Sequence, residues 1–550
     1  MDRDRRALTG TAARLAAAAI PVAFLLVLFA YPVGTILARG LGDGFVGVVR
    51  RRSTGRIAWF TCWQAAASTV LTLGVGLPAA WAVARGSLPG RRLVRAVVVV
   101  PFVLPTLVVG AALEAAFDRL GLDGRGGGLR LDRTVWAILL AHAVFNVAVV
   151  VRLVGGRWAA LDRRPEDAAR TLGAGRLRVL ATVVAPRLAP AIWGAAGIVF
   201  LFCFTSFGIL LTVGGPGHPT LETEIWRYAT RRTDLATAAS LAVVQLLAVV
   251  AMVVVVNGFE RRAAEGVGAD RGTGATGPRE AGRGAWRDRA LALLAAAPAL
   301  ALAAVPLVAL VERSLAVGGG HGLAHYRALG RRTGSGLFVA PTEALAASLR
   351  TAAVAGVVAL VVGGLAAAAV ARSGRGWGGR SLDALLMIPL GTSAVTLGFG
   401  FLLALDRPPL DLRRSWLLVP LAQALVGIPF VVRTVLPALR APDRRRRDAA
   451  TALGAPPWRA RLTADGPVIG RALLAGLGFA FVVSLGEFGA TSVLARPDAP
   501  TVPVAMYRLL GRPGDSLRGQ AMALATILAV VTAVVVLVVE RLRPRDALGW

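Results

Sequence analysis

Uncharged apolar runs of about 20 residues recur along the chain and alternate with short, arginine-rich polar segments. A helix of that length spans the hydrocarbon core of a bilayer, and lipid admits only helices or closed barrels because backbone polar groups must be paired internally. Since the runs are long and uninterrupted, we predict an all-α integral membrane protein. Its twelve expected transmembrane helices are 15–38, 62–84, 96–117, 135–151, 188–213, 235–257, 290–311, 347–371, 384–405, 416–432, 472–494 and 519–539.

A polar stretch near the middle of the chain divides these helices into two sets of six. Residues 258–288 are rich in Gly, Ala and charged residues and show no apolar periodicity, which is typical of a flexible linker. We therefore expect a first half at 1–257, with its core at about 58–257, and a second half at 289–550, with its core at about 345–542.

One polar segment occurs once in each half. DAARTLGAGRLRVLATVVAP begins at Asp167 and DAATALGAPPWRARLTADGP begins at Asp448, 281 positions later. Both read Asp-Ala-Ala, three residues, Gly, twelve residues, Pro. A basic loop in a membrane protein is unremarkable when it occurs once, but two copies in register indicate a selected feature.

Other matches extend this repeat over both halves. VVVR ending at Arg152 matches FVVR ending at Arg433, and SFG from Ser206 matches EFG from Glu487, again 281 positions apart. Matches in the same order, with length differences confined to loops, indicate a duplication. Because each half contains six helices, both halves enter the membrane in the same orientation and form a parallel repeat.

The repeated loop carries the signals of a short surface helix. Pro165 suits a first helical turn, and Glu166 and Asp167 place negative charge at the positive end of the helix. Gly173, and Gly454 in the second copy, suits a left-handed helix cap. We expect a helix–turn–helix in which small side chains let the backbone of another protein approach closely.

Composition narrows the possible functions. The chain is 56% hydrophobic with mean hydropathy +0.65, above the usual range for soluble domains. Its net charge is +31, and all of the basic residues counted in that charge are arginines. Because the chain has no lysine, it cannot form a standard P-loop. We expect no nucleic-acid partner, and we interpret Cys62 and Cys203 as core residues rather than a disulfide framework.

Arginine placement predicts the orientation. With the N-terminus in the cytoplasm, cytoplasmic segments carry more arginines than external segments. The first apolar run is too long for a signal peptide and lacks a clear cleavage site, so we interpret it as a retained span. Both termini and both repeated loops are therefore expected on the cytoplasmic side.

The repeated loop resembles the Glu-Ala-Ala loop of ATP-binding cassette (ABC) importer permeases, with Asp in place of Glu. The second copy is less similar at its tail, where Ala464 and Gly466 replace aliphatic residues. The matching positions are Asp167, Ala168, Ala169, Gly173 and Pro186 in the first copy and Asp448, Ala449, Ala450, Gly454 and Pro467 in the second.

The resemblance implies a type I permease fold in the bacterial inner membrane, with each loop docking one of two ABC ATPase subunits. It also implies an extracytoplasmic solute-binding protein. ATP would be hydrolysed on the partner subunits, so this chain would be no enzyme and would bind no cofactor.

The residues are less informative about the solute. The stretches after Cys203 and Ser484 look most like thiamine-type permeases, and next most like those for ferric iron. An ion-coupled secondary transporter is the alternative from another class, but it would not need paired cytoplasmic loops. We find no residues spaced to support a membrane-embedded enzyme.

A few polar residues lie within apolar spans. Glu487, its repeat mate Ser206, and Glu114 are candidates for the translocation path, because ionisable groups in spans usually face a cavity or the bundle interior. A carboxylate would suit a cationic solute such as thiamine, although Glu487 could instead serve helix packing.

Four further polar residues have simpler interpretations. His142 and Gln423 occupy equivalent repeat positions, which favours helix–helix hydrogen bonds. His321 and His325 could share a helix face but lack a third ligand, so we expect no metal site.

Overall fold

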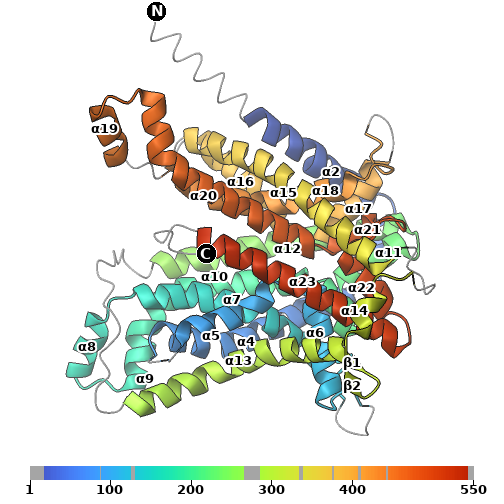
Figure 1. Ribbon diagram of the computed structural model, residues 1–550, viewed down its shortest axis with the longest axis horizontal. Helices are drawn as coiled ribbons and strands as arrows, with labels where there is room; N and C mark the ends of the chain where they lie inside the picture. The colour runs from blue at the N-terminus through green and yellow to red at the C-terminus, as the bar shows by residue number, and fades with distance from the viewer. Residues whose placement is uncertain are drawn as a thin grey trace, which may run out of the picture. The chain divides into compact units, whose positions relative to one another are not determined.

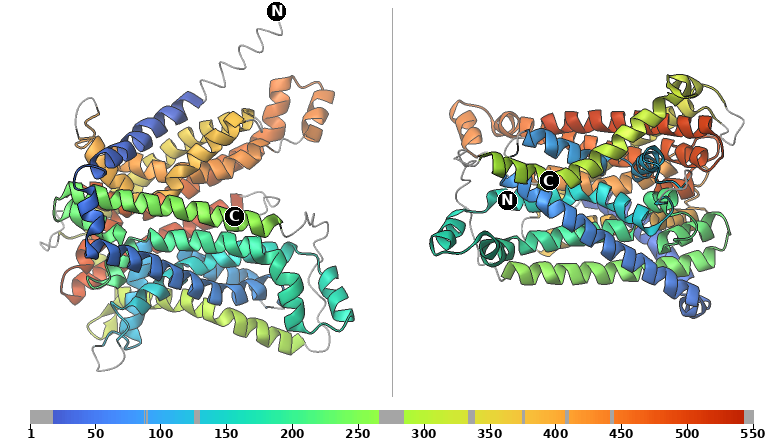
Figure 2. Two further views of the ribbon diagram at one scale, coloured as in Figure 1. Left: turned by 180° about the vertical axis from the view of Figure 1, so that it is seen from behind. Right: turned by 90° about the horizontal axis from the view of Figure 1, so that it is seen from below.

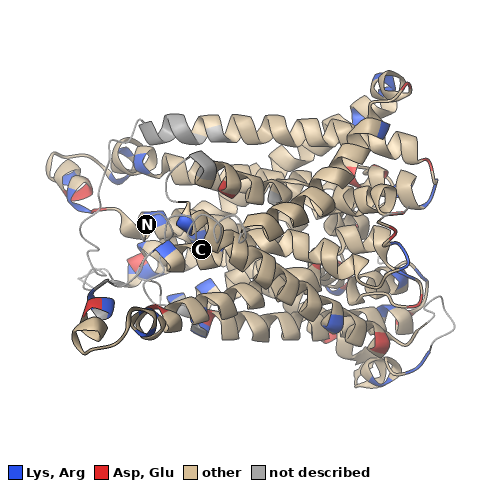
Figure 3. Cartoon of the chain, turned by 90° about the horizontal axis from the view of Figure 1, so that it is seen from above, with Lys and Arg blue, Asp and Glu red and all other residues tan. Residues whose placement is uncertain are grey.

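The computed structural model describes residues 18–86, 88, 90–124, 130–265, 285–332, 339–373, 377–406, 410–440 and 444–542. Ten helices in this described part are long and apolar enough to cross a membrane, and two further spans are bent helix pairs, giving up to twelve. Charged residues gather toward the helix ends, while the middles of the long helices contain few (Figure 3). The prediction of an all-α membrane fold with about twelve spans is confirmed.

The elements follow the order of the predicted spans (Figure 1). The first half contains η1 (Leu26–Ala30), α2 (Tyr31–Gly40), α3 (Phe45–Arg50), α4 (Arg52–Ala84), α5 (Arg91–Val103), α6 (Thr106–Arg119), α7 (Val135–Ala160), α8 (Arg164–Thr171), α9 (Arg176–Val179), η2 (Leu180–Val184), α10 (Ala185–Phe204), η3 (Leu210–Gly214), α11 (Leu221–Thr230) and α12 (Leu235–Glu265). The three elements labelled η are π-helical turns.

The second half repeats this order and adds a short hairpin. It contains α13 (Ala285–Leu315), β1 (Ala316–Val317), β2 (Gly320–His321), α14 (Ala324–Ala328), α15 (Pro341–Arg372), α16 (Trp377–Gly391), α17 (Ala394–Ala404), α18 (Leu418–Arg440), α19 (Arg444–Ala452), α20 (Pro457–Gly486), α21 (Gly489–Leu494), α22 (Val502–Leu510) and α23 (Asp515–Leu542). The strands pair antiparallel, with Ala316 opposite His321. Most of the predicted linker 258–288 lies outside the described residues, but α12 and α13 extend into its two ends.

The predicted spans 96–117 and 384–405 are broken rather than continuous. The axis turns by 111° between α5 and α6, where Leu104 is extended because it precedes Pro105. It turns by 91° between α16 and α17, where Ser393 is extended and accepts a hydrogen bond from the Thr396 amide at 3.1 Å. Each half therefore places a helix N-terminus inside its third span.

The fifth span of each half also ends before its predicted boundary. In place of one helix over 188–213, α10 ends at Phe204 and η3 begins at Leu210. In place of one helix over 472–494, α20 ends at Gly486 and α21 follows. In both breaks the helix stops before the repeated Phe-Gly pair and resumes at its glycine, Gly208 or Gly489. A β-carbon built at Gly208 would overlap the Thr106 hydroxyl oxygen, and one at Gly489 would lie 2.9 Å from the Ala394 β-carbon. The close approach of another helix therefore requires glycine at both positions.

The chain folds into two compact units, and each unit is built mainly from one half of the sequence but includes the first span of the other half. Unit 1 comprises Met1–Val49, Glu224–Val243 and Ser314–Ala547, and unit 2 is formed mainly by Arg50–Thr223 and Val244–Arg313. In unit 1, apolar residues of the N-terminal helix pack with α17 and α18. In unit 2, alanines of α13 pack with α4 and α5. The first helix of each half thus belongs to the core of the other half.

Candidate functional site

The first repeated loop forms a short helix with a left-handed end. α8 carries Glu166 and Asp167 in its first turn, as the sequence predicts. Gly173 has φ +85°; its amide donates to the Arg170 carbonyl at 3.0 Å, and the next amide donates to the Ala169 carbonyl at 3.0 Å. No atom lies within 4 Å of a β-carbon built at Gly173, so the backbone angle, and not crowding, requires glycine.

The second repeated loop has the same backbone. Gly454 after α19 also has φ +85°; its amide donates to the Thr451 carbonyl at 2.9 Å, and the next amide donates to the Ala450 carbonyl at 3.0 Å. These are the same bonds displaced by 281 positions. In Figures 1 and 2, α8 and α19 appear as short helices beyond the ends of the long helices of their own units. The duplication therefore extends to the hydrogen bonds that end the helix.

Both loops expose large apolar side chains at equivalent positions. Leu172 is 88% exposed and Leu453 is 89% exposed, each directly before the left-handed glycine. Leu177 and its repeat mate Trp458 are also exposed. Exposed apolar groups gathered in one place are typical of contact sites for another molecule, whereas single ones are ordinary. Leu177, Leu453 and Trp458 were not among the residues selected from the sequence.

The Ala and Pro positions of the repeated loop are placed alike in both copies. Ala168 and Ala449 are exposed, and each is followed by a half-buried alanine. Pro186 and Pro467 are also exposed, but neither marks the entry to a span, because the helix already runs from Arg176 in the first copy and from Pro457 in the second. The π-helical turn η2 before Pro186 accommodates the missing amide.

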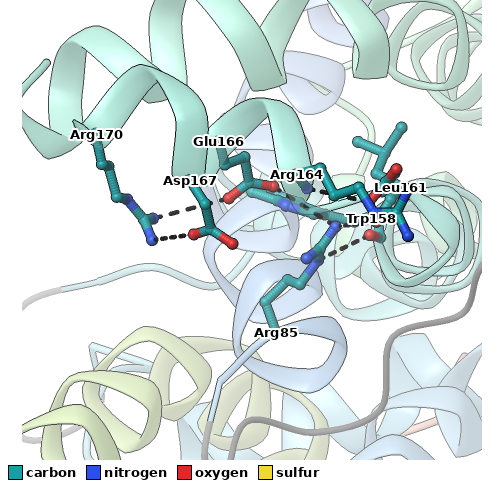
Figure 4. A network of polar contacts seen from close by, with 8 residues as sticks. Arg85, Trp158, Leu161, Arg164, Glu166, Asp167 and Arg170 are labelled. Carbon is teal, nitrogen blue, oxygen red and sulfur yellow. Dashed lines mark hydrogen bonds and ion pairs between the residues drawn. The ribbon is translucent and has the colours of Figure 1, made fainter. Parts of the chain in front are cut away.

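An arginine at the end of α4 connects the first loop to the spans (Figure 4). Arg85 donates from Nε to the Trp158 carbonyl at 3.0 Å and from a terminal nitrogen to the Leu161 carbonyl at 2.6 Å. The same guanidinium lies 3.6 Å from a Glu166 carboxylate oxygen. Burial lowers the pKa of Arg85, and the charge of Glu166 opposes that shift, so the acid supports the charged form.

The second loop is connected differently. Arg447 of α19 donates from Nε to an Asp465 carboxylate oxygen on α20 at 2.6 Å, and a terminal nitrogen of Arg447 contacts the same oxygen. The Asp465 side chain is almost fully buried. Neither Arg85 nor Asp465 was among the site residues that the sequence analysis selected.

The candidate path residue Glu487 has a structural partner. One carboxylate oxygen accepts from the Ala490 amide at 2.7 Å, and the other accepts from the Thr491 amide at 3.0 Å. Glu487 therefore accepts hydrogen bonds from amides at the N-terminus of α21 and acts as a cap for that helix. This corresponds to the helix-packing role that was the alternative to a path role. Ser206 is buried with no hydrogen-bond partner for its hydroxyl among the described residues, and Glu114 lies half-buried on α6.

Replacing Glu487 with alanine is expected to destabilise the protein. Loss of a helix N-cap costs about 1 to 2 kcal/mol, so the thermal unfolding midpoint of the detergent-purified protein should fall. Glu487→Gln keeps an acceptor oxygen and should lower the midpoint less. Ser206→Ala, at the repeat-equivalent position, should leave the midpoint unchanged. Equal midpoints for wild type and Glu487→Ala would contradict the capping role.

His142 and Gln423, the intramembrane residues at equivalent repeat positions, each form a hydrogen bond to another helix, as predicted. The Nδ1 atom of His142 lies 2.9 Å from the Ser68 hydroxyl, and Gln423 donates to the Thr491 hydroxyl at 3.4 Å. Outside the spans, His325 bonds the Ala316 carbonyl at 2.8 Å. Within the described part of the chain, no group of three His, Cys, Asp or Glu side chains could hold a metal ion.

Two buried carboxylates were not predicted from the sequence. Glu222 and Glu224 on α11 are 1% and 2% exposed. Gln245 donates to Glu222, and Arg227 donates to Glu224 at 2.6 Å. The signal was present in the repeat, because TLETE carries two acids where the second half reads TVPVA.

The spans, the broken third helices and the repeated surface loops together define a multi-pass helical membrane protein built from two repeats. Residues 73–265 match the family model described as "Binding-protein-dependent transport system inner membrane component". The chain is 28% identical to the thiamine transport system permease protein ThiP of Brucella abortus over 98% of this chain and 97% of that protein. It is 26% identical to Escherichia coli ThiP over 92% of each.

A shorter relative matches with higher identity. The molybdenum transport system permease protein ModB of Mycobacterium tuberculosis is 32% identical over 42% of this chain and 90% of its own length. The chain belongs to the family of binding-protein-dependent transport system inner membrane components, the permeases of ABC importers. This membership implies a non-enzymatic transport subunit whose partner subunits use ATP, and it implies a binding-protein partner.

Proposed function

We propose that this permease imports thiamine or its phosphates, delivered by an extracytoplasmic solute-binding protein. The observation that carries the proposal is the extent of the similarity: the relatives named for thiamine match over almost the whole chain, whereas the molybdenum permease matches over 42%. No feature of the site favours ferric iron, the second candidate from the sequence. With the family known, the alternative of an ion-coupled secondary transporter is set aside.

The two repeated loops are the proposed docking sites for two ATPase subunits. Their support is the recurrence of one surface: an Asp-Ala-Ala helix, an exposed leucine and a glycine at φ +85° in both copies. Docking on ATPases requires both loops and both termini to lie in the cytoplasm, in agreement with the arginine distribution. ATP-driven closure of the ATPase pair would then shift the permease between conformations through differential binding.

Ser206, Glu114 and Glu487 remain the proposed path residues. In the light of its hydrogen bonds, Glu487 would act by fixing α21 rather than by direct contact with the solute. Ser206, at the equivalent break of the first half, has a buried hydroxyl without a hydrogen-bond partner among the described residues, and this supports its proposed role.

Uptake of radiolabelled thiamine by cells lacking this gene, and by the same cells complemented with it, tests the substrate. We expect loss of high-affinity uptake on deletion and full recovery on complementation. Unchanged thiamine uptake, together with loss of ferric-iron uptake, would overturn thiamine as the solute and retain the permease.

A further inference from the structure

The first turn of each docking helix carries an ion pair, and the two pairs have opposite polarity. Position 166 is an acid, Glu166, and the equivalent position 281 residues later is a base, Arg447. Glu166 pairs with Arg85 at 3.6 Å, and Arg447 pairs with Asp465 at 2.6 Å. The same site on the repeated helix therefore reaches a partner of opposite charge in each half.

The partners also come from different spans. Arg85 lies at the end of α4, whereas Asp465 lies in α20. Arg85 and Arg372 are equivalent, because each ends a Val-Ala-Arg run at the end of its helix, α4 or α15; the offset here is 287 positions. Arg372 has the same sign as Arg447 and so cannot neutralise it. Asp465 aligns with Val184, which cannot pair with Glu166. The change from an acid at position 166 to a base at position 447 is therefore accompanied by a new acidic partner, Asp465, in the second half.

Both pairs are sheltered from water on at least one side. The side chains of Arg85 and Glu166 are 9% and 15% exposed, and those of Asp465 and Arg447 are 10% and 34% exposed. Surface ion pairs contribute little because water and salt screen them. Removing one partner of a buried pair is far more damaging, because the other charge is left without compensation.

We propose that these pairs position the docking helices, and that each helix transmits ATPase movement to a different span. Arg85 joins the start of α8 to the ends of α4 and α7 through its bonds to Glu166, Trp158 and Leu161. The Arg447–Asp465 pair joins α19 to α20 alone. The two docking sites are therefore not interchangeable. This inference rests on the proposed docking function of the loops.

Transplanting each arrangement into the other half tests the inference. Glu166→Arg places two arginines together and should lower thiamine uptake at least about tenfold. Adding Val184→Asp supplies the partner that the second half uses and should restore at least half of the lost uptake. In the second loop, Arg447→Glu should lower uptake similarly, and adding Asp465→Val should restore it by leaving Arg372 as the partner.

The readout separates positioning from folding. The single variants are expected in the membrane at wild-type levels and to capture the ATPase subunit, because the exposed leucines and the glycines are intact. In proteoliposomes they should hydrolyse ATP with less thiamine transported per ATP. Arg157→Glu, which makes the same charge change as Arg447→Glu on an exposed residue of α7, is the control and should match wild type. If Glu166→Arg does not accumulate, Glu166→Gln replaces it and should reduce uptake several-fold.

Wild-type uptake by the single variants would overturn the inference, as would failure of both double variants to recover uptake while present in the membrane. Failure of the proposed function looks different. In that case the wild-type protein itself would capture no ATPase subunit or transport no thiamine, whatever the charges at these positions.

Discussion

Gly173→Asp combined with Gly454→Asp is expected to abolish thiamine uptake while the protein remains in the membrane at its normal level. Both glycines have φ +85°, where a β-carbon strains the backbone by about 1 to 2 kcal/mol. Relief of that strain redirects the turn that ends each docking helix, and the added carboxylate lies next to the exposed leucine. Since no neighbouring atom is displaced, the transmembrane core should be unaffected.

A glycine in the same turn provides a matched control. Gly175 is exposed and has nothing within 4 Å of a built β-carbon, but its φ is −66° and it caps α9. Aspartate is favoured at such a cap, so Gly175→Asp should retain uptake. Uptake is measured with labelled thiamine, and membrane level by immunoblot. Normal uptake by the Gly173→Asp/Gly454→Asp protein would remove the loops from the transport mechanism.

Leu172→Glu combined with Leu453→Glu is expected to prevent assembly with the ATPase subunits. Burial of one leucine contributes about 1.5 to 3 kcal/mol, so each substitution should weaken its site about tenfold or more. Both side chains are almost fully exposed, and surface substitutions of this kind change stability by no more than about 0.5 kcal/mol. The unfolding midpoint should therefore remain that of wild type.

Co-purification of the ATPase subunit with the affinity-tagged permease measures this effect. Leu323→Glu changes a leucine that is 55% exposed and lies outside both loops, and it should leave capture unchanged. Equal recovery of the ATPase subunit with wild type and with the Leu172→Glu/Leu453→Glu protein would show that the leucines are not docking residues.

The sequence predicted the parts of the structure that depend on local rules. A bilayer dictates helix length and composition, so the spans could be located from apolar runs alone. Gly173 and Gly454 could be predicted as helix ends because a left-handed cap selects glycine. The repeat strengthened both predictions, since each half tested the other.

Features that depend on tertiary contacts could not be predicted in the same way. The exchange of first spans between the compact units leaves no local pattern, because the helices are equally apolar wherever they pack. Glu487 was ambiguous because an acid in a span can cap a helix or face a solute, and only the position of α21 decides between them. Arg85 and Asp465 could not be distinguished from other charged residues in the sequence, because their partners lie on other helices.

The central claim is that each repeated loop contacts one ATPase subunit, and photo-crosslinking in cells tests it most directly. A photoreactive amino acid is placed at position 172 or at position 453, with position 323 as the control. Our account predicts an adduct with the mass of permease plus one ATPase subunit at both loop positions and none at the control. An ATPase adduct at neither loop position, or at only one, would contradict it.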